Sequence, residues 1–219
     1  MDRPKIRAVT FDMDGLMFNT EDLYDIVGEQ LLNRRGQSFT PEIKMAMMGL
    51  PGVVAFGVMK ELCSLDDSVE ALAEECEALF ADLLPKRIQK MPGLDVLLGL
   101  LETSGIPKAI ATSSHARFAT TALEMFDLQP RFEFVLTAES VTQGKPHPEI
   151  YLSAAEKHSV DPAEMLVLED SIHGSNAALA AGATTIGVPS RRVDRAQFGS
   201  VYAICDRLDD ARVLELIRN

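Results

Sequence analysis

Cysteine and long apolar runs are both scarce in this chain of 219 residues. The three cysteines are odd in number and form no Cys-x-x-Cys pair, so we expect free thiols and a reducing compartment. No apolar run is long enough to span a bilayer, and the first residues lack the apolar segment of a signal peptide. These absences predict a cytoplasmic protein with no membrane partner.

Basic residues are fewer than acidic ones. Lysine and arginine together number 21 against 33 acidic residues, which gives a net charge of -12. We therefore expect no nucleic-acid polymer as a partner, because binding a phosphate backbone needs clustered basic side chains. A small phosphorylated metabolite is still compatible with this charge, because a bound divalent cation can reverse the local field.

Apolar residues make up 47% of the chain, enough for a sizeable core in one large domain or in one domain with an insert. Helical periodicity covers residues 21–86, where no strand signal occurs. From Pro92 onward, short apolar runs alternate with helical patterns. Together with the run at 6–11, these runs predict strands at 108–112, 132–136, 165–168, 184–188 and 201–204.

This alternation predicts an α/β fold, a doubly wound, Rossmann-like parallel sheet covered by helices on both faces. The helical block would interrupt that fold just after its first strand. We therefore expect an α/β core of residues 1–16 and 87–219, with residues 17–86 as an inserted, all-helical domain. The insert leaves the predicted sheet next to the strand ends, so it is placed to act as a lid.

Acidic and hydroxyl residues stand at the predicted strand ends. Asp12 and Asp14 follow the first apolar run, Thr112 ends a second, and Glu169-Asp170 follow a third. Ligands of parallel sheets bind beyond the carboxyl ends of the strands, so we expect these residues to converge. Acids at the end of a buried strand are costly unless they bind a metal or take part in chemistry.

These residue types suit phosphoryl transfer. Asp12, Asp14 and Asp170 offer the hard oxygen ligands that Mg²⁺ prefers. The turn at 112–114, Thr-Ser-Ser, offers hydroxyl and N–H groups at the start of a predicted helix, a natural oxyanion site. Lys145, in Gly-Lys-Pro-His-Pro, adds one cation. Such groups can position and neutralise a phosphoryl group, and a carboxylate can act as the nucleophile.

Each motif has a simpler interpretation when it stands alone. Asp-x-Asp-Gly also occurs in calcium loops, although Leu16 and the lack of a glutamate at the twelfth position are unlike an EF-hand. Thr-Ser-Ser is more often a helix cap, Gly-Lys-Pro a surface turn, and Glu-Asp the start of a loop. Their occurrence in this order, each at a strand end or adjoining loop, favours the functional interpretation.

At these motifs the chain resembles the haloacid-dehalogenase superfamily, in the branch of β-phosphoglucomutase-like sugar phosphatases. The resemblance implies a Mg²⁺-dependent phosphatase that hydrolyses a small phosphomonoester, sugar phosphate or nucleotide-like, through an aspartyl-phosphate intermediate. Residues 17–86 would be a helical cap. The matching segments are Phe-Asp-Met-Asp-Gly at 11–15, Ala-Thr-Ser-Ser at 111–114, Gly-Lys-Pro-His-Pro at 144–148 and Leu-Glu-Asp-Ser-Ile-His-Gly at 168–174.

The resemblance also implies roles for single residues. Asp12 would be the nucleophile and a metal ligand. Asp14 would bind the metal through its backbone carbonyl, while its side chain acts as acid and then as base. Asp170 would be the third protein ligand, with Glu169 beside it, often through water. The expected phosphate-binding residues are Gly15, Thr112, Ser113, Ser114 and Lys145.

Three positions depart from the family's pattern. Asn19, near the expected cap hinge, stands where aspartate is usual. Phosphoglucomutases carry an arginine where Gly52 falls, in the loop at 49–52, and tend to have a histidine where Tyr24 falls. A mutase must hold a doubly phosphorylated intermediate, so the missing arginine favours a phosphatase over a phosphohexomutase. The segments Met-Asp-Gly-Leu at 13–16, Met-Pro-Gly at 91–93 and Ile-Pro at 106–107, before Ala-Thr-Ser-Ser, are similar to those of pseudouridine-5′-phosphatases, which suggests one substrate.

A non-enzymatic alternative is a phospho-accepting signalling module, which also uses acids, a hydroxyl, a lysine and Mg²⁺ on a doubly wound sheet. Such modules lack a helical insert after the first strand. Asp14, two residues from the expected nucleophile, favours rapid turnover over storage. His115 and His147 are expected to be surface histidines, with substrate contact as the alternative. The self-contained core and insert are consistent with a monomer.

Overall fold

A computed structural model describes residues 4–47, 50, 52–189 and 193–218. By its internal contacts the chain divides into two compact units, a larger one of Met1–Phe18 and Lys90–Asn219 and a smaller one of Asn19–Gln89. Among the described residues, no helix combines the length and apolar character that crossing a membrane requires.

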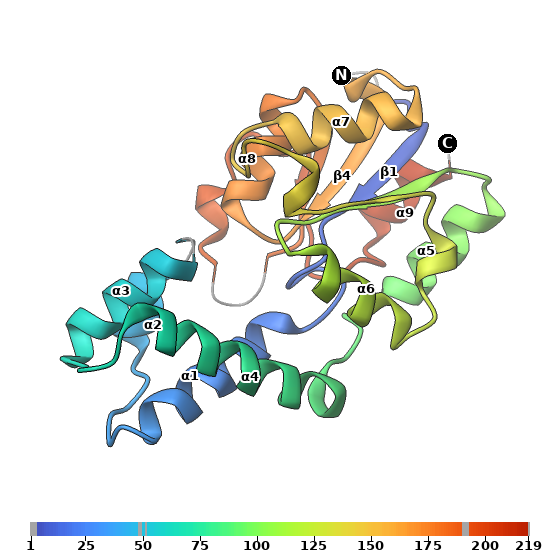
Figure 1. The fold of residues 1–219 in the computed structure, drawn as a ribbon. Coiled ribbons are helices and arrows are strands. Elements are labelled where there is room, and N and C mark those ends of the chain that lie inside the picture. The colour runs from blue at the N-terminus through green and yellow to red at the C-terminus, as the bar shows by residue number, and fades with distance from the viewer. Residues whose placement is uncertain (1–3, 48–49, 51, 190–192, 219) are drawn as a thin grey trace. The chain divides into compact units, whose positions relative to one another are not determined.

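The larger unit is built on a six-stranded sheet in which every neighbouring pair is parallel (Figure 1). The strand order β3-β2-β1-β4-β5-β6 confirms the predicted doubly wound α/β fold. The strands are β1 (Ala8–Phe11), β2 (Lys108–Ala111), β3 (Val135–Leu136), β4 (Met165–Glu169), β5 (Thr184–Gly187) and β6 (Ala203–Ile204).

The strand order places β1 at the centre, between β2 and β4. Val9 lies beside Lys108 on one side and Leu166 on the other. Residues of β1, β2 and β4 are buried throughout, which fits a sheet covered on both faces. The chain moves outward in one direction from β1 to β3 and in the other from β4 to β6. This reversal beside β1 is where such sheets bind ligands.

Helices of the larger unit cover the sheet according to the hand of the crossovers. Crossovers between parallel strands are right-handed as a rule, which for this strand order puts α5 and α6 on one face and α7 and α8 on the other. The face under α7 and α8 holds a core rich in alanine, with Tyr151 its largest side chain. The helices are α5 (Leu94–Thr103), α6 (Ala116–Glu124), α7 (Glu149–His158), α8 (Ile172–Ala180) and α9 (Ala211–Ile217), with 3-10 turns at Gln129–Arg131, Ala138–Ser140, Pro162–Glu164 and Arg195–Phe198.

Two predicted strands are reduced to two residues each in the structure, while the others change by one or two residues. The pattern at 132–136 becomes a strand only at Val135–Leu136, because a 3-10 turn at Gln129–Arg131 delays the entry of the chain into the sheet. Backbone bonds to β2 nevertheless begin at Glu133, whose N–H donates to the Lys108 carbonyl (2.9 Å). The strand predicted at 201–204 is limited to Ala203–Ile204.

The described residues of the smaller unit form four helices and no strand. Its core is formed by apolar side chains from every helix, including Leu31, Ile43, Met59 and Leu72. Arg35, just after the first helix, binds Asp67 through two nitrogens and Glu75 through one. It therefore joins the end of the first helix to the loop before the fourth helix and to the fourth helix itself. The helices are α1 (Thr20–Asn33), α2 (Pro41–Met47), α3 (Gly52–Cys63) and α4 (Val69–Arg87).

The start of α4 shows how local chemistry sets a boundary. The periodicity predicts a helix over 66–84, whereas α4 spans Val69–Arg87. The Ser68 hydroxyl accepts a hydrogen bond from the Ala71 N–H (3.1 Å) and so fixes the first turn. Pro85 lies inside the last turn, where the missing N–H costs one bond, and the helix continues to Arg87.

Candidate active site

The turn after β1 presents Asp12 and Asp14 at the carboxyl end of the sheet. The Asp12 N–H donates to the Leu168 carbonyl of β4 (3.0 Å), so the ladder holds its backbone, and its side chain is buried. Gly15 has a φ of 77°, which permits the sharp reversal that follows. The Gly15 N–H donates to the Phe18 carbonyl across this turn (2.9 Å), so it would have to share that hydrogen to contact a phosphoryl group.

Lys145 reaches Asp12 from the loop before α7. Its Nζ donates to Asp12 Oδ1 (2.6 Å), to the Ala111 carbonyl (2.9 Å) and to Glu169 Oε1 (2.7 Å). The three donors of the ammonium are therefore all used, and the side chain is only 5% exposed. Residues from three separate strand ends thus meet at one cation.

Burial and charge have opposite effects on the pKa values of Asp12 and Lys145. Burial raises the pKa of the Asp12 carboxyl to about 8, while the Lys145 ammonium opposes that rise. Burial also disfavours the charge of Lys145, but Asp12 and Glu169 outweigh it and hold the Lys145 pKa well above its usual value. Lys145 is therefore a permanent cation, and Asp12 needs further positive charge to be fully ionised near neutral pH.

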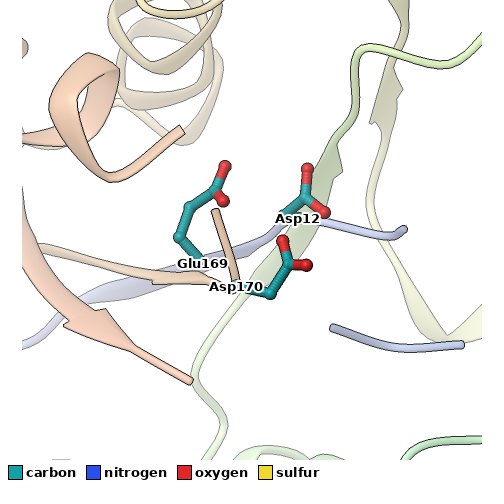
Figure 2. Close-up of side chains that lie close together, drawn as sticks. All are labelled: Asp12, Glu169 and Asp170. Atoms are coloured by element: carbon teal, nitrogen blue, oxygen red, sulfur yellow. The ribbon is translucent and has the colours of Figure 1, made fainter. Parts of the chain in front are cut away.

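Three buried carboxylates, Asp12, Glu169 and Asp170, lie together at the ends of β1 and β4 (Figure 2). Each offers an oxygen within 4.8 Å of the others. This grouping brings together the predicted acids of two strands. The Asp14 side chain points elsewhere, so any contribution from Asp14 to a cation would come from its backbone carbonyl, as the family resemblance implies.

Glu169 differs from the other two acids because four hydrogen bonds already fill its carboxylate. Oε1 accepts from Lys145 Nζ and from the Tyr151 hydroxyl (2.6 Å). Oε2 accepts from the Ser171 N–H (3.2 Å) and the Ser171 hydroxyl (2.9 Å). Its side chain is fully buried. Glu169 is therefore held as a partner of Lys145, which leaves Asp12 and Asp170 as the carboxylates suited to direct metal contact.

The donor set fits a divalent cation. Three carboxylates share this buried position with a single ammonium, so the site carries excess negative charge that a dication would balance. All the donors are hard oxygens, and neither thiolate nor imidazole belongs to the group, which favours Mg²⁺ over a softer transition metal.

The Asp14 carboxylate is held by the turn after β2. Its Oδ2 accepts from the Thr112 hydroxyl (3.1 Å) and from the Ser114 hydroxyl (2.7 Å). Thr112 also accepts from the Ser114 N–H (3.0 Å), which closes the turn. Ser113 is exposed. The structure thus brings the predicted acid and the predicted phosphate turn into direct contact, across a separation of about a hundred residues.

Two further acids, which the sequence motifs do not single out, fix the loops that carry these groups. Glu139 accepts from His115 Nδ1 (2.8 Å) and from the Ala116 N–H (3.2 and 3.3 Å), at the start of α6. A bond from the Thr137 hydroxyl, followed in effect by the bond from His115, lowers the pKa of Glu139 to about 2. Glu139 reaches this helix start from the 3-10 turn at Ala138–Ser140, 24 residues after His115, so no local sequence signal marks the contact.

Glu149 is the second of these acids, and it fixes the loop that carries Lys145. Its carboxylate accepts from the N–H groups of Thr142 (2.8 Å) and Gln143 (2.9 Å) and from the Thr142 hydroxyl. The His147 Nδ1 accepts from the Glu149 N–H (3.3 Å), so this histidine belongs to the same turn. His115 and His147 are both exposed, and each is bound to a glutamate or its backbone.

The three departures from the family pattern fall in the smaller unit. Asn19 Oδ1 accepts from the Gln89 N–H (2.7 Å), which ties together the first and last residues of that unit. Tyr24 is half exposed and stacks on Phe80, with ring centroids 4.5 Å apart. Gly52 begins α3 with open space around it. Gly49 and Pro51 of the same loop lie outside the described residues.

Gly174 has no Cβ, and this leaves the space that the Glu169 carboxylate occupies. A Cβ added at Gly174 would lie 1.7 Å from Glu169 Oε1, the atom that binds Lys145 and Tyr151. Gly174→Ala must displace that carboxylate. We expect it to lower the free energy of unfolding by about 1–3 kcal/mol, and to lower the activity proposed below about tenfold, as measured by denaturant unfolding and initial rates.

Gly99 supplies the matched control for this change. It lies inside α5, and a Cβ there would meet nothing within 4 Å. Gly99→Ala should stabilise the protein by up to about 1 kcal/mol through helix propensity and leave the rate unchanged. A Gly174→Ala variant as stable and active as the natural protein would show that Glu169 has space to move without consequence.

Comparison with known proteins identifies the family of this chain. The chain matches the family model of haloacid dehalogenase-like hydrolases over residues 9–188, a range that contains every site residue named above. A phosphorylated carbohydrates phosphatase of Thermotoga maritima is 33% identical over 213 residues, covering 95% of this chain and 90% of that protein. A probable pseudouridine-5′-phosphatase of Drosophila melanogaster is 33% identical over 212 residues, covering 94% and 91%.

Among solved structures, a haloacid dehalogenase hydrolase of family IA, variant 3, from Entamoeba histolytica has a TM-score of 0.82 with this chain. It is 26% identical, and the match covers 98% of this chain and all of that one. The predicted resemblance is thus confirmed, and the enzyme is favoured over the signalling module. The chain belongs to the haloacid dehalogenase-like hydrolase family.

Proposed function

We propose that this protein is a Mg²⁺-dependent phosphatase that hydrolyses a small phosphomonoester through a phosphoryl group carried on Asp12. The observation that supports this most is the meeting of Asp12, Lys145 and the Asp14–Thr112 pair at the carboxyl edge of one sheet. This arrangement joins a nucleophile, a fixed cation and a proton donor, the parts that phosphoryl transfer requires.

In the first half of the reaction, a carboxylate oxygen of Asp12 attacks phosphorus while the bond to the leaving oxygen breaks. Lys145 stays bonded to Asp12 and supplies positive charge to the transferring group. Asp14 gives its proton to the leaving oxygen, so the product departs as an alcohol. The Thr112 and Ser114 hydroxyls hold Asp14 and would share their hydrogens with the phosphoryl oxygens of a bound substrate.

In the second half, Asp14 acts as the base. It takes a proton from water, and the water oxygen attacks phosphorus as the bond to Asp12 breaks. Inorganic phosphate leaves, and both carboxyl groups return to their starting forms. A Mg²⁺ held by Asp12, Asp170 and the Asp14 backbone carbonyl would neutralise phosphoryl charge and favour the ionised form of Asp12.

The smaller unit would be the cap that determines which phosphomonoester is accepted. Position 52 is glycine, so it offers no side chain that could hold the second phosphate of a bisphosphate, and this favours hydrolysis over a mutase reaction. The relatives named above act on phosphorylated carbohydrates and on pseudouridine 5′-phosphate. We therefore place the substrate among sugar and nucleoside monophosphates. Like the cap role, a cytoplasmic, monomeric protein remains a prediction of the sequence.

The test is a phosphate-release screen over sugar phosphates, nucleotides and pseudouridine 5′-phosphate, with and without Mg²⁺. We expect release from at least one compound, with loss of activity when EDTA removes the metal and recovery when Mg²⁺ is returned. Chromatography of the organic product separates the two candidate reactions, since a phosphatase yields the free alcohol and a mutase an isomeric phosphate. Release that is indifferent to EDTA would contradict the metal dependence.

A further inference from the structure

Tyr151 lies next to Lys145 and Glu169, although the proposed reaction assigns it no role. It is in the first turn of α7, and its side chain is fully buried. Its hydroxyl donates to Glu169 Oε1 (2.6 Å), and its ring centroid lies 5.0 Å from Lys145 Nζ. One buried side chain therefore contacts both Lys145 and the carboxylate that binds Lys145.

The two carboxylates around Lys145 compete for one ammonium. Lys145 donates to both Asp12 and Glu169, over nearly equal distances of 2.6 and 2.7 Å. The Tyr151 hydroxyl supplies Glu169 Oε1 with a second donor. Without it, that oxygen would be poorly satisfied in a buried site and would attract the ammonium more strongly. Lys145 would then move toward Glu169 at the expense of Asp12.

The ring of Tyr151 acts in the same direction. An ammonium within about 6 Å of an aromatic centroid is attracted to the face of the ring, more strongly when water is excluded. Lys145 meets both conditions, since it is 5% exposed. Burial, with the negative charge of Glu169, holds the pKa of Tyr151 well above its usual value, so the hydroxyl stays a donor.

We propose that Tyr151 is a positioning residue, whose hydroxyl occupies Glu169 and whose ring contacts Lys145, so that the ammonium remains on Asp12 and the transferring phosphoryl group. The inference deepens the proposed function and rests on it for its kinetic readout. A purely structural role would predict that changes at Tyr151 alter stability and leave the rate of each folded molecule unaltered.

Tyr151→Phe isolates the hydroxyl, because it keeps the ring and the packing. We expect kcat to fall about tenfold and KM to rise by a smaller factor of about threefold, since loss of a partner that orients a site residue typically costs 10–100-fold. Tyr202→Phe is the matched control, because Tyr202 is 49% exposed in the same unit. It should behave as the natural protein does. An unchanged kcat in Tyr151→Phe would overturn the inference and leave the phosphatase intact.

A double-mutant cycle tests the route through Glu169. If Tyr151 acts by occupying that carboxylate, the hydroxyl should matter less once Glu169 is neutral. Tyr151→Phe should therefore cost less than about threefold in kcat in a Glu169→Gln background. An undiminished tenfold loss there would show that Tyr151 works independently of Glu169, contrary to the proposal.

Binding of inorganic phosphate gives a readout that needs no substrate. Calorimetry with Mg²⁺ and phosphate should show weaker binding to Tyr151→Phe, by about threefold or more, and unchanged binding to Tyr202→Phe. Equal affinities for both variants would contradict the placement of Lys145 by Tyr151. If the natural protein binds phosphate in this pattern but hydrolyses nothing in the screen, the proposed reaction fails while the positioning role stands.

Discussion

Asp12→Asn is expected to reduce phosphate release by at least about 10⁴-fold, because an amide cannot act as the nucleophile that the carboxylate provides. The change should not unfold the protein. The amide oxygen can still accept from Lys145, and the neutral side chain removes a charge that burial disfavours at this position. Initial rates and thermal unfolding of the purified variant, without metal, measure the two effects separately.

Asp127→Asn is the matched control for this change. Asp127 is exposed and has a φ of 52°, a conformation that asparagine tolerates well, so this variant should retain full activity and stability. A rate for Asp12→Asn within tenfold of the natural protein would assign the nucleophile to another group. Acid-quenched protein should carry phosphoryl in the natural form and none in Asp12→Asn.

Lys145→Met is expected to damage both stability and activity. The variant leaves Asp12 and Glu169 buried with no cation between them, which should cost about 3–5 kcal/mol of unfolding free energy. Loss of the charge that faces the transferring group should lower kcat by about 10²–10³-fold. Denaturant unfolding and initial rates report the two effects, and Lys157→Met, at an exposed position of α7, serves as the control.

A double variant separates the two consequences of losing Lys145. Lys145→Met combined with Glu169→Gln removes one of the carboxylates that the single change leaves unpaired. We expect it to recover most of the lost stability and none of the lost activity, because the ammonium beside Asp12 is still missing. If activity returned together with stability, Lys145 would be a structural residue with no direct part in the reaction.

Much of the fold was predictable because local patterns encode it. The alternation of short apolar runs with helical periodicity after Pro92 predicts parallel strands, and the confirmed order β3-β2-β1-β4-β5-β6 is a common solution for such a chain. Strand limits were less accurate. At 132–136 the apolar pattern is that of a strand, but the preceding 3-10 turn delays pairing with β2.

In the candidate site, too, some residues could be predicted from local sequence patterns and others could not. Asp12, Thr112 and Asp170 could be found because each ends a buried run, where a polar residue needs a reason. Glu139 and Tyr151 could not be assigned a function, because each acts through a partner in another segment of the chain. Glu149 lies in the first turn of α7, a position where an acid is favoured, so a local signal was present for it. Tyr151 in particular resembles an ordinary core residue of α7 until its hydroxyl is placed on Glu169.

By itself the sequence determined which chemical groups stand at the carboxyl edge of the sheet, since strand ends and side-chain types are local properties. Only the tertiary structure decided how those groups share their hydrogen bonds. Lys145 meets Asp12 across 133 residues, and Glu169 gives its lone pairs to Lys145, Tyr151 and Ser171. Such choices depend on distances of a few tenths of an ångström in a buried site, which no periodicity along the chain records.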